Sequence, residues 1–190
     1  MKILSAILLA IVACGLVHAQ KVTDPTVKSM GDALRAEGNN HIFLDLLQTA
    51  GQGFPIGFLP KVSAGIFDTT KTAQYTILAP TDAAFAQLPA GTIEKLKSDP
   101  AKLREFLMSY IVPGRIMIAD MLVPTKENAT TTRLDATSMD GAKVSFLCNA
   151  HSGDHHPRIN DVARIGKADI PFYAGVIHQI DRLLHINPFQ

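Results

Sequence analysis

The chain has 190 residues, and its 18 Lys and Arg residues nearly balance its 17 Asp and Glu residues, which gives a formal net charge of +1. Proteins that bind nucleic acid or acidic membrane surfaces usually carry a clear excess of positive charge, so the composition gives no support for either class. The length suits one ordinary domain with a sizeable hydrophobic core.

Residues 1–19 have the pattern of a secretory signal peptide. An apolar run over residues 3–13, too short to span a bilayer, leads to a small-residue cleavage site after Ala19. We therefore expect residues 20–190 to be secreted as a single domain, either extracellular or periplasmic. The residues around Cys14 are also compatible with a bacterial lipobox, so a lipid anchor through Cys14 is the alternative. No later run of the sequence is apolar for long enough to cross a membrane.

Helical signals dominate the first half of the chain. Asp24 and Asp99 are each followed by proline, which combines an N-cap residue with a preferred first helical residue. Another helix is expected after Asn40 as its N-cap, and a short one over Gly91–Lys97. Apolar residues recur at intervals of three and four in the longer helices, so each should bury one face. In chain order they are Val27, Met30 and Leu34; Ile42, Phe43, Leu46, Leu47 and Ala50; and Leu103, Phe106, Leu107 and Tyr110.

Residues Gly51–Thr72 are expected to form an irregular segment, because they include four glycines and two prolines. They also carry many large apolar side chains, among them Phe54, Phe58 and Phe67. We expect this segment to fold over the domain as an additional layer of core. The alternative is that it forms a surface that binds an apolar ligand or partner.

The stretch Thr76–Leu88 predicts a strand that ends abruptly and becomes a short helix. The residue before Pro80 is held in extended geometry, which favours a strand up to that point. Thr81 and Asp82 are both good N-cap residues, and Asp82 is expected to accept N–H groups of the turn that follows it. Phe85 should then point from this short helix into the core.

From Thr130 onward the pattern changes to short apolar runs separated by Gly, Asn and Asp, which predicts strands. Helices in the first half and strands in the second half indicate an α+β domain rather than repeated βαβ units. The helix that contains Tyr110 should end at Val112–Gly114, and an extended segment should begin at Arg115. The predicted strands are Thr130–Leu134, Lys143–Leu147, Arg158–Asn160, Ala163–Ile165 and Val176–Ile180.

Two motifs resemble the signatures of the fasciclin-like (FAS1) domain. APTDAAF, at residues 79–85, is similar to the first signature, and GVIHQID, at Gly175–Asp181, is similar to the second. The resemblance covers roughly residues 24 to 188, the ordinary extent of such a domain. It implies an α+β fold with a wedge-shaped, β-sandwich-like core flanked by several short helices. The residues that it marks as structural are Thr81, Asp82, Phe85, His178 and Asp181.

The resemblance also implies a function without catalysis. It points to a secreted cell-adhesion or extracellular-matrix module that binds a protein or a polysaccharide. The alternative is a soluble carrier of an apolar small molecule such as a carotenoid, because some fasciclin-like proteins of algae have this role. The apolar segment Gly51–Thr72 is the local reason for that alternative, and no other cofactor is expected.

Two residues at one helix end are candidates for partner binding, together with Phe54, Phe58 and Phe67. Many fasciclin-like domains carry a Tyr-His pair here, and the segment is linked with adhesion in animal relatives. This chain has Tyr110 but Ile111 at the histidine position, which argues against a receptor-type site. We favour a core position for Tyr110, with its hydroxyl group hydrogen-bonded at the edge of the core.

His178 is expected to be a buried, hydrogen-bonded structural residue rather than a catalytic one. On a strand it shares one face with the β-branched residues Val176 and Ile180. Since both signatures should sit in the same core, its polar partner is expected near Thr81 and Asp82.

The remaining candidates have simple interpretations. The histidines and aspartate of residues 151–156 are possible metal ligands, but their irregular spacing favours a surface hairpin loop and no metal site. Cys148 is expected to be a buried thiol. Asn128 begins a glycosylation sequon, which matters in a eukaryotic secretory pathway. The sequence contains no phosphate-binding loop, nucleophile elbow or His-Glu-x-x-His motif, so no catalytic residue is predicted.

Overall fold

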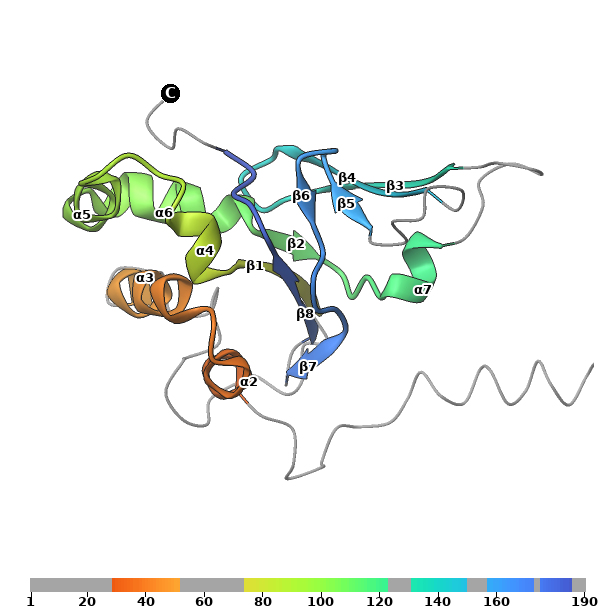
Figure 1. The fold of residues 1–190 in the computed structure, drawn as a ribbon, viewed down its shortest axis with the longest axis horizontal. Coiled ribbons are helices and arrows are strands. Elements are labelled where there is room, and N and C mark those ends of the chain that lie inside the picture. The colour runs from red at the N-terminus through yellow and green to blue at the C-terminus, as the bar shows by residue number, and fades with distance from the viewer. Residues whose placement is uncertain (1–28, 52–73, 123–130, 150–156, 173–174, 186–190) are drawn as a thin grey trace, which may run out of the picture.

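A computed structural model of the protein describes residues 29–51, 74–122, 131–149, 157–172 and 175–185. Within these ranges, helices and strands form three layers (Figure 1). The helices are α2 (Met30–Glu37), α3 (His41–Gly51), α4 (Asp82–Phe85), α5 (Thr92–Ser98), α6 (Pro100–Ser109) and α7 (Ile118–Met121). The strands are β1 (Tyr75–Pro80), β2 (Ile111–Pro113), β3 (Thr131–Thr137), β4 (Lys143–Asn149), β5 (Arg158–Ile159), β6 (Ala163–Arg164), β7 (Ile170–Phe172) and β8 (Gly175–Ile180).

The strands form two four-stranded sheets. Sheet A has the order β2-β1-β8-β7, and sheet B has the order β3-β4-β5-β6. Helices α2 to α6 gather on one side of sheet A, and sheet B lies on the other side (Figure 1). Every pairing is antiparallel except that of β1 with β8. This arrangement confirms the predicted α+β class.

Strand β1 leads into the first motif, β8 contains most of the second, and the two strands lie side by side in parallel. Their register runs from Tyr75 opposite Gly175 to Pro80 opposite Ile180. All six residues of β8 are buried, because β8 is covered by strands on both edges and by layers on both faces. The expectation that both motifs share one core is therefore confirmed.

Helix α6 forms as its sequence predicts. The Asp99 side chain accepts hydrogen bonds from Ala101 N–H (3.1 Å) and Lys102 N–H (3.0 Å), and proline occupies the first turn. The predicted apolar face is buried. Helix α2 is instead capped by Ser29, which accepts from Asp32 N–H at 3.1 Å. The predicted start at Asp24 lies outside the described residues.

The segment after α6 differs from the prediction. Helix α6 ends at Ser109, with Tyr110 as its C-cap, and the next strand is Ile111–Pro113 rather than a segment that begins at Arg115. The chain leaves the helix early because β2 pairs with β1 along the edge of sheet A. A three-residue edge strand has too little periodicity to be seen in sequence, and β7 was missed for the same reason.

Gly175 is required by the close approach of β8 to β1. Its φ is +153°, and a Cβ atom placed there would lie 1.8 Å from the carbonyl oxygen of Tyr75. Backbone atoms of a central strand cannot move aside without breaking the ladder. Gly141 has a positive φ of +91°, but a Cβ atom there would meet nothing within 4 Å.

We predict that Gly175→Ala lowers the free energy of unfolding by about 3 kcal/mol or more, because the methyl group collides with backbone. Gly141→Ala is the matched control and should cost only about 1–2 kcal/mol from its left-handed backbone. Urea denaturation followed by circular dichroism measures both. Equal losses for the two variants would contradict a special role for Gly175.

Candidate functional site

The polar residues of both motifs meet where β1 and β8 end. Parallel strands present their carboxyl ends at the same edge, and here Thr81 N–H donates to the carbonyl oxygen of Ile180 at 3.0 Å. Asp181, directly after β8, accepts from Arg164 N–H through Oδ1 at 2.7 Å, which ties β6 to this end. Phe85, one turn further along the first motif, is buried and lies against Phe106 with ring centroids 6.3 Å apart.

A buried amide network connects this edge to the turn between α2 and α3. Gln179 Nε2 donates to Asn39 Oδ1 (2.7 Å) and to Asn40 Oδ1 (2.6 Å). Asn40 Nδ2 donates to the carbonyl oxygens of Ala79 (3.2 Å) and Pro80 (2.8 Å). Because buried amides are costly when unpaired, this network fixes the position of the helices on sheet A. Sequence reasoning missed Gln179 and Asn39, which no local pattern distinguishes.

Asp82 caps a different helix from the one predicted. Its Oδ1 accepts from Ile42 N–H at 2.9 Å, and its Oδ2 lies 2.8 Å from His41 Nδ1, so the carboxylate caps α3. Thr81 is the N-cap of α4 but makes no capping hydrogen bond with its side chain. Asn40 precedes α3, but its amide is directed at the carbonyl groups of β1, which leaves the first turn of α3 open for Asp82.

The carboxyl group of Asp82 is held in its charged form. Partial burial alone would raise its pKa, but the hydrogen bond from Ile42 N–H and the contacts with His41 outweigh burial and lower it. A carboxylate at the start of α3 also has a favourable interaction with the helix dipole. These contacts make Asp82 a structural anchor for the first turn of α3.

His178 is buried and hydrogen-bonded as predicted, but its predicted partners are wrong. Its Nε2–H donates to the carbonyl oxygen of Ile116 at 2.8 Å, and Asp169 N–H donates to Nδ1 at 3.2 Å. Side chains alternate along a strand, so Gln179 points toward the α2–α3 turn while His178 points to the opposite face. The polar partners on the side of Thr81 and Asp82 therefore bind Gln179, the next residue along β8, and not His178.

Burial lowers the pKa of His178, although the Ile116 carbonyl and the Asp169 carboxylate oppose the shift. Both ring nitrogens are engaged with the backbone in an arrangement that suits the neutral imidazole. The ring has no contact with solvent, and so it cannot exchange a proton with a substrate at the surface.

Tyr110 and Ile111 lie inside the core, with 0% and 2% of their surfaces exposed. The hydroxyl oxygen of Tyr110 accepts from Leu184 N–H at 3.1 Å, and its ring packs against Phe106 and Phe43. Burial raises the pKa of this phenol. The core position preferred for Tyr110 is confirmed, whereas a direct partner contact by either residue does not agree with their burial.

Several sequence candidates fall outside the described residues: Phe54, Phe58, Phe67, Asn128 and the histidines of residues 151–156. Cys148 is described, and its thiol is buried with a pKa raised by that burial. Within the described ranges, no group of three or more His, Cys, Asp or Glu side chains is placed to hold a metal ion. No helix in the same ranges is long and apolar enough to cross a membrane.

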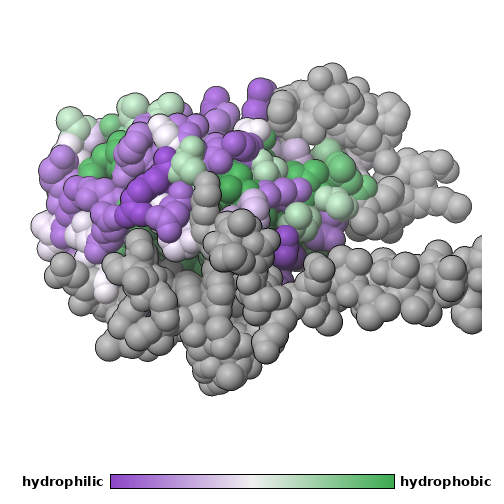
Figure 2. All heavy atoms as spheres, turned by 90° about the horizontal axis from the view of Figure 1, so that it is seen from below, coloured by the Kyte–Doolittle hydropathy of each residue, from purple (hydrophilic) through white to green (hydrophobic). Residues whose placement is uncertain are grey.

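A shallow pocket of about 150 Å³ lies beside the motif edge, between the end of α4 and the chain after β8. It is lined by Ala84, Gln87, Leu88, Val162, Arg182 and Leu183. The face in Figure 2 is mainly hydrophilic, with hydrophobic residues in small separate areas. Large exposed apolar side chains among the described residues are Leu122 and Val162.

Comparison with known proteins identifies the family. Residues 58–186 match the sequence model of the family described as Fasciclin domain. The chain belongs to the fasciclin domain family. The resemblance carried by the two motifs is thereby confirmed, and the parallel pairing of β1 with β8 brings the two motifs together.

The relatives of this fasciclin domain have names that refer to the cell surface or to growth-factor induction. It is 30% identical to cell surface glycolipoprotein MPB83 of Mycobacterium bovis over 138 residues, which cover 70% of this chain and 54% of that protein. It is 34% identical to transforming growth factor-beta-induced protein ig-h3 of Sus scrofa over 111 residues, or 58% of this chain and 14% of that protein. The chain thus spans about half the length of MPB83.

A solved structure shows the same fold. The FAS1 domain pair of the insect cell adhesion molecule fasciclin I superimposes with a TM-score of 0.54 at 20% sequence identity. The match covers 80% of this chain and 46% of the solved chain. This agreement concerns the arrangement of helices and sheets, which the α+β prediction anticipated.

We predict that Asp82→Ala lowers the free energy of unfolding by about 1–2 kcal/mol, because α3 loses its cap. Thr81→Ala is the matched control and should cost less than about 0.5 kcal/mol, since the Thr81 side chain makes no capping bond. Urea denaturation separates the two. If Thr81→Ala lost as much stability as Asp82→Ala, the result would instead support the predicted capping of the helix that directly follows these residues.

We predict that the buried His178 makes stability fall in mild acid. Its folded-state pKa lies below the ordinary value of 6.5, so below that pH the unfolded chain takes up a proton that the folded chain does not. The free energy of unfolding should fall by up to about 1.4 kcal/mol per pH unit until the folded pKa is reached.

Denaturation of the wild type and of His178→Gln between pH 7.5 and 5 measures this contribution. The variant should be less stable at pH 7.5 and should lose this part of the slope. The exposed His185 provides a matched control, because His185→Gln leaves the buried imidazole in place. A slope that survives in His178→Gln would assign the effect to other groups.

Proposed function

We propose that this fasciclin domain is a secreted module for adhesion or matrix interaction, which binds an extracellular protein or polysaccharide without covalent chemistry. The observation that carries the proposal is the family match over residues 58–186. The names of MPB83 and of the insect cell adhesion molecule support a place at the cell surface. MPB83 is named a glycolipoprotein, which also keeps a lipid anchor at Cys14 open as the alternative to cleavage after Ala19.

The chemistry of the motif edge supports a role without catalysis. The Asp82 carboxylate caps α3 and is paired with His41, and both ring nitrogens of His178 are bonded to backbone groups. General acid–base catalysis needs a titratable group within reach of a substrate proton, and the buried His178 presents none. The pocket between α4 and the chain after β8 is smaller than the roughly 300–1,000 Å³ typical of small-molecule sites. Within the described part of the chain, a partner held on an open face is more consistent with this geometry than a ligand enclosed in this pocket.

The carotenoid-carrier alternative depends on Phe54, Phe58 and Phe67 in Gly51–Thr72, a segment that lies beyond the described residues apart from its first residue. It remains a separate proposal with a simple test. An organic extract of the purified protein would show visible absorption if a carotenoid were bound.

Immobilised protein covering residues 20–190 tests the adhesion proposal directly. We predict saturable binding to at least one member of a panel of heparin, alginate, mannan, collagen and fibronectin, measured by biolayer interferometry. Heat-denatured protein is the control, because binding should require the folded domain. Folded protein that binds no member of the panel and instead carries a pigment would contradict adhesion and support the carrier.

A further inference from the structure

Strand β3 forms an edge of sheet B without the usual protection against pairing with a further strand. Edge strands of soluble proteins are commonly short or contain proline, because their open N–H and C=O groups can bind another strand. The other edge strands follow this rule: β2 and β7 have three residues each and contain Pro113 and Pro171, and β6 has two residues. In contrast, β3 has seven residues without proline and pairs regularly with β4 from Thr131 to Thr137.

The backbone of β3 presents alternate residues to this open edge. Ser138 N–H donates to the carbonyl oxygen of Ala142 at 2.9 Å, and hydrogen-bonded pairs alternate along an antiparallel ladder. The register therefore directs the backbone groups of Thr132, Leu134 and Ala136 toward β4. In the described part of the chain no strand lies beyond β3, so the intervening residues direct their N–H and C=O groups to the open edge. These residues are Thr131, Arg133, Asp135 and Thr137.

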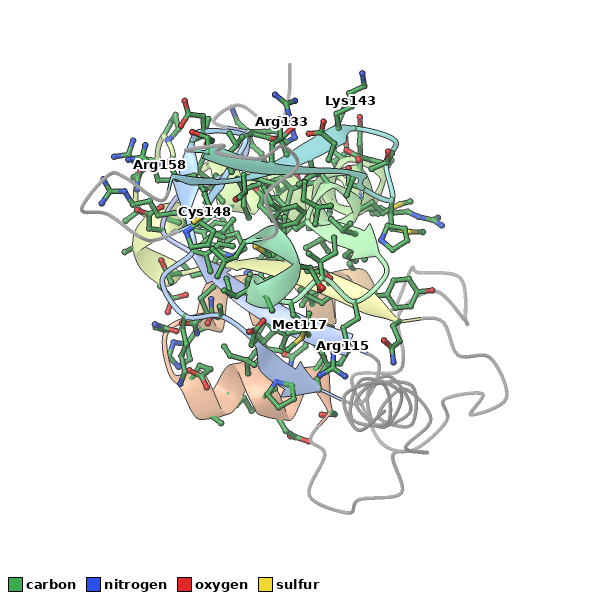
Figure 3. The ribbon with its side chains drawn as sticks, turned by 90° about the vertical axis from the view of Figure 1, so that its right-hand side faces the viewer. Arg115, Met117, Arg133, Lys143, Cys148 and Arg158 are labelled. Atoms are coloured by element: carbon green, nitrogen blue, oxygen red, sulfur yellow. The ribbon has the colours of Figure 1, made fainter. Side chains whose placement is uncertain are left out.

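The residues whose backbone faces the edge also carry exposed side chains on the outer face of sheet B. The side chains of Arg133 and Asp135 are 60% and 61% exposed. Figure 3 shows Arg133 pointing away from the domain, whereas Cys148 lies on the inner side of the sheet. On that inner side Leu134 is only partly buried, although Phe146, opposite it in β4, is fully buried. A further strand at this edge would cover Leu134.

Two copies of β3 are complementary in charge when they pair with each other. A two-fold axis makes their pairing antiparallel, and residues whose backbone groups face the edge must then lie opposite one another. With the axis at Leu134, Arg133 of each copy lies opposite Asp135 of the other copy, and Thr131 lies opposite Thr137. Moving the axis by one residue places Arg133 opposite Arg133 or Asp135 opposite Asp135, which is unfavourable. Of the registers that keep most of the strand paired, one therefore joins opposite charges.

The charged side chains are held in place before a second copy arrives. Arg133 Nε donates to Asp135 Oδ1 at 2.8 Å, and Arg133 Nη2 donates to Ser145 Oγ at 3.0 Å. The Ser145 hydroxyl group donates to the same Oδ1 atom at 2.6 Å. The hydrogen bonds from Ser145 and Arg133 lower the pKa of Asp135, so its carboxylate stays charged. Lys143 on β4 and Asp140 in the turn before it have opposite charges and add no net charge to this edge.

We propose that two copies of this protein pair through β3 and continue sheet B across a two-fold axis. The contact consists of backbone hydrogen bonds along the strand, the two Arg133–Asp135 pairs and the Leu134 side chains at the axis. A pair of single strands buries less than the roughly 1,200–2,000 Å² of a stable interface, so the dimer is weak and reversible. This inference goes beyond the proposed matrix binding and does not depend on it, but a dimer presents two domains to one matrix polymer and so raises avidity.

Sedimentation velocity between about 5 and 300 μM tests this pairing, and we expect a reversible shift from monomer to dimer. Arg133→Asp places carboxylates opposite each other at both pairs, and Asp135→Arg places guanidinium groups there. Each change alone should weaken dimerisation by about tenfold or more. An equimolar mixture of the two variants has opposite charges at both pairs, so dimers should form again in the mixture.

Arg35→Asp and Glu105→Arg are the matched controls, because they make the same changes in charge at exposed ion pairs on α2 and α6. They should change dimerisation by less than about twofold. Thr137→Pro removes an N–H group from the open edge and none from the ladder with β4, so it should also weaken the dimer. Thermal denaturation checks the fold of every variant.

A protein that stays monomeric over the whole concentration range would overturn the inference. A dimer that survives both single changes, or a mixture of the variants that remains monomeric, would also overturn it. Collagen or fibronectin bound by a monomeric wild type and released by Thr137→Pro would assign the edge to another partner instead. The ligand panel tests the proposed function separately: folded protein that dimerises but binds no member of the panel contradicts matrix binding and leaves the pairing of β3 intact.

Discussion

Strand β8 lies between β1 and β7, and both faces of its six residues are covered. Its parallel pairing with β1 joins segments far apart in the chain, so the loop that it closes contains most of the domain. The helices α4 to α6 and the whole of sheet B depend on that closure, because they are attached to the chain between the two strands. Gly175 marks the point where the two backbones come too close for any side chain.

The end of this strand pair sets the position of the helical layer. The Gln179 amide donates to Asn40, and the Asn40 amide donates to carbonyl groups of β1. The Asp82 carboxylate accepts from the first turn of α3. Each group satisfies another that would otherwise be buried without a partner, so the network is cooperative. The polar residues at this edge therefore join the helical layer to sheet A.

Local patterns in the sequence predicted the elements whose causes are local. The cap at Asp99, the apolar face that ends at Tyr110 and the strand runs of the second half all follow from periodicity and capping. The capping of α3 by Asp82 was not predictable, because it depends on where a residue distant in sequence lies in space. The partners of His178 were misassigned because pairing register decides which side chain of β8 faces which layer.

The outer face of sheet B shows the same limit of sequence reasoning. Arg133, Arg158 and Arg164 come from three separate strands, and no local sequence pattern links them. Only the register of sheet B brings them to one level, so a one-residue slip in any strand would turn its arginine inward.

The central place of β8 has a consequence for how the protein is made. Sheet A lacks β8 until residue 180 has been synthesised. Until that point β1 has only β2 as a partner. Because the chain is synthesised from its N-terminus, β1 and β8 cannot pair for most of its synthesis. The domain can therefore complete its core only after its last strand has been made.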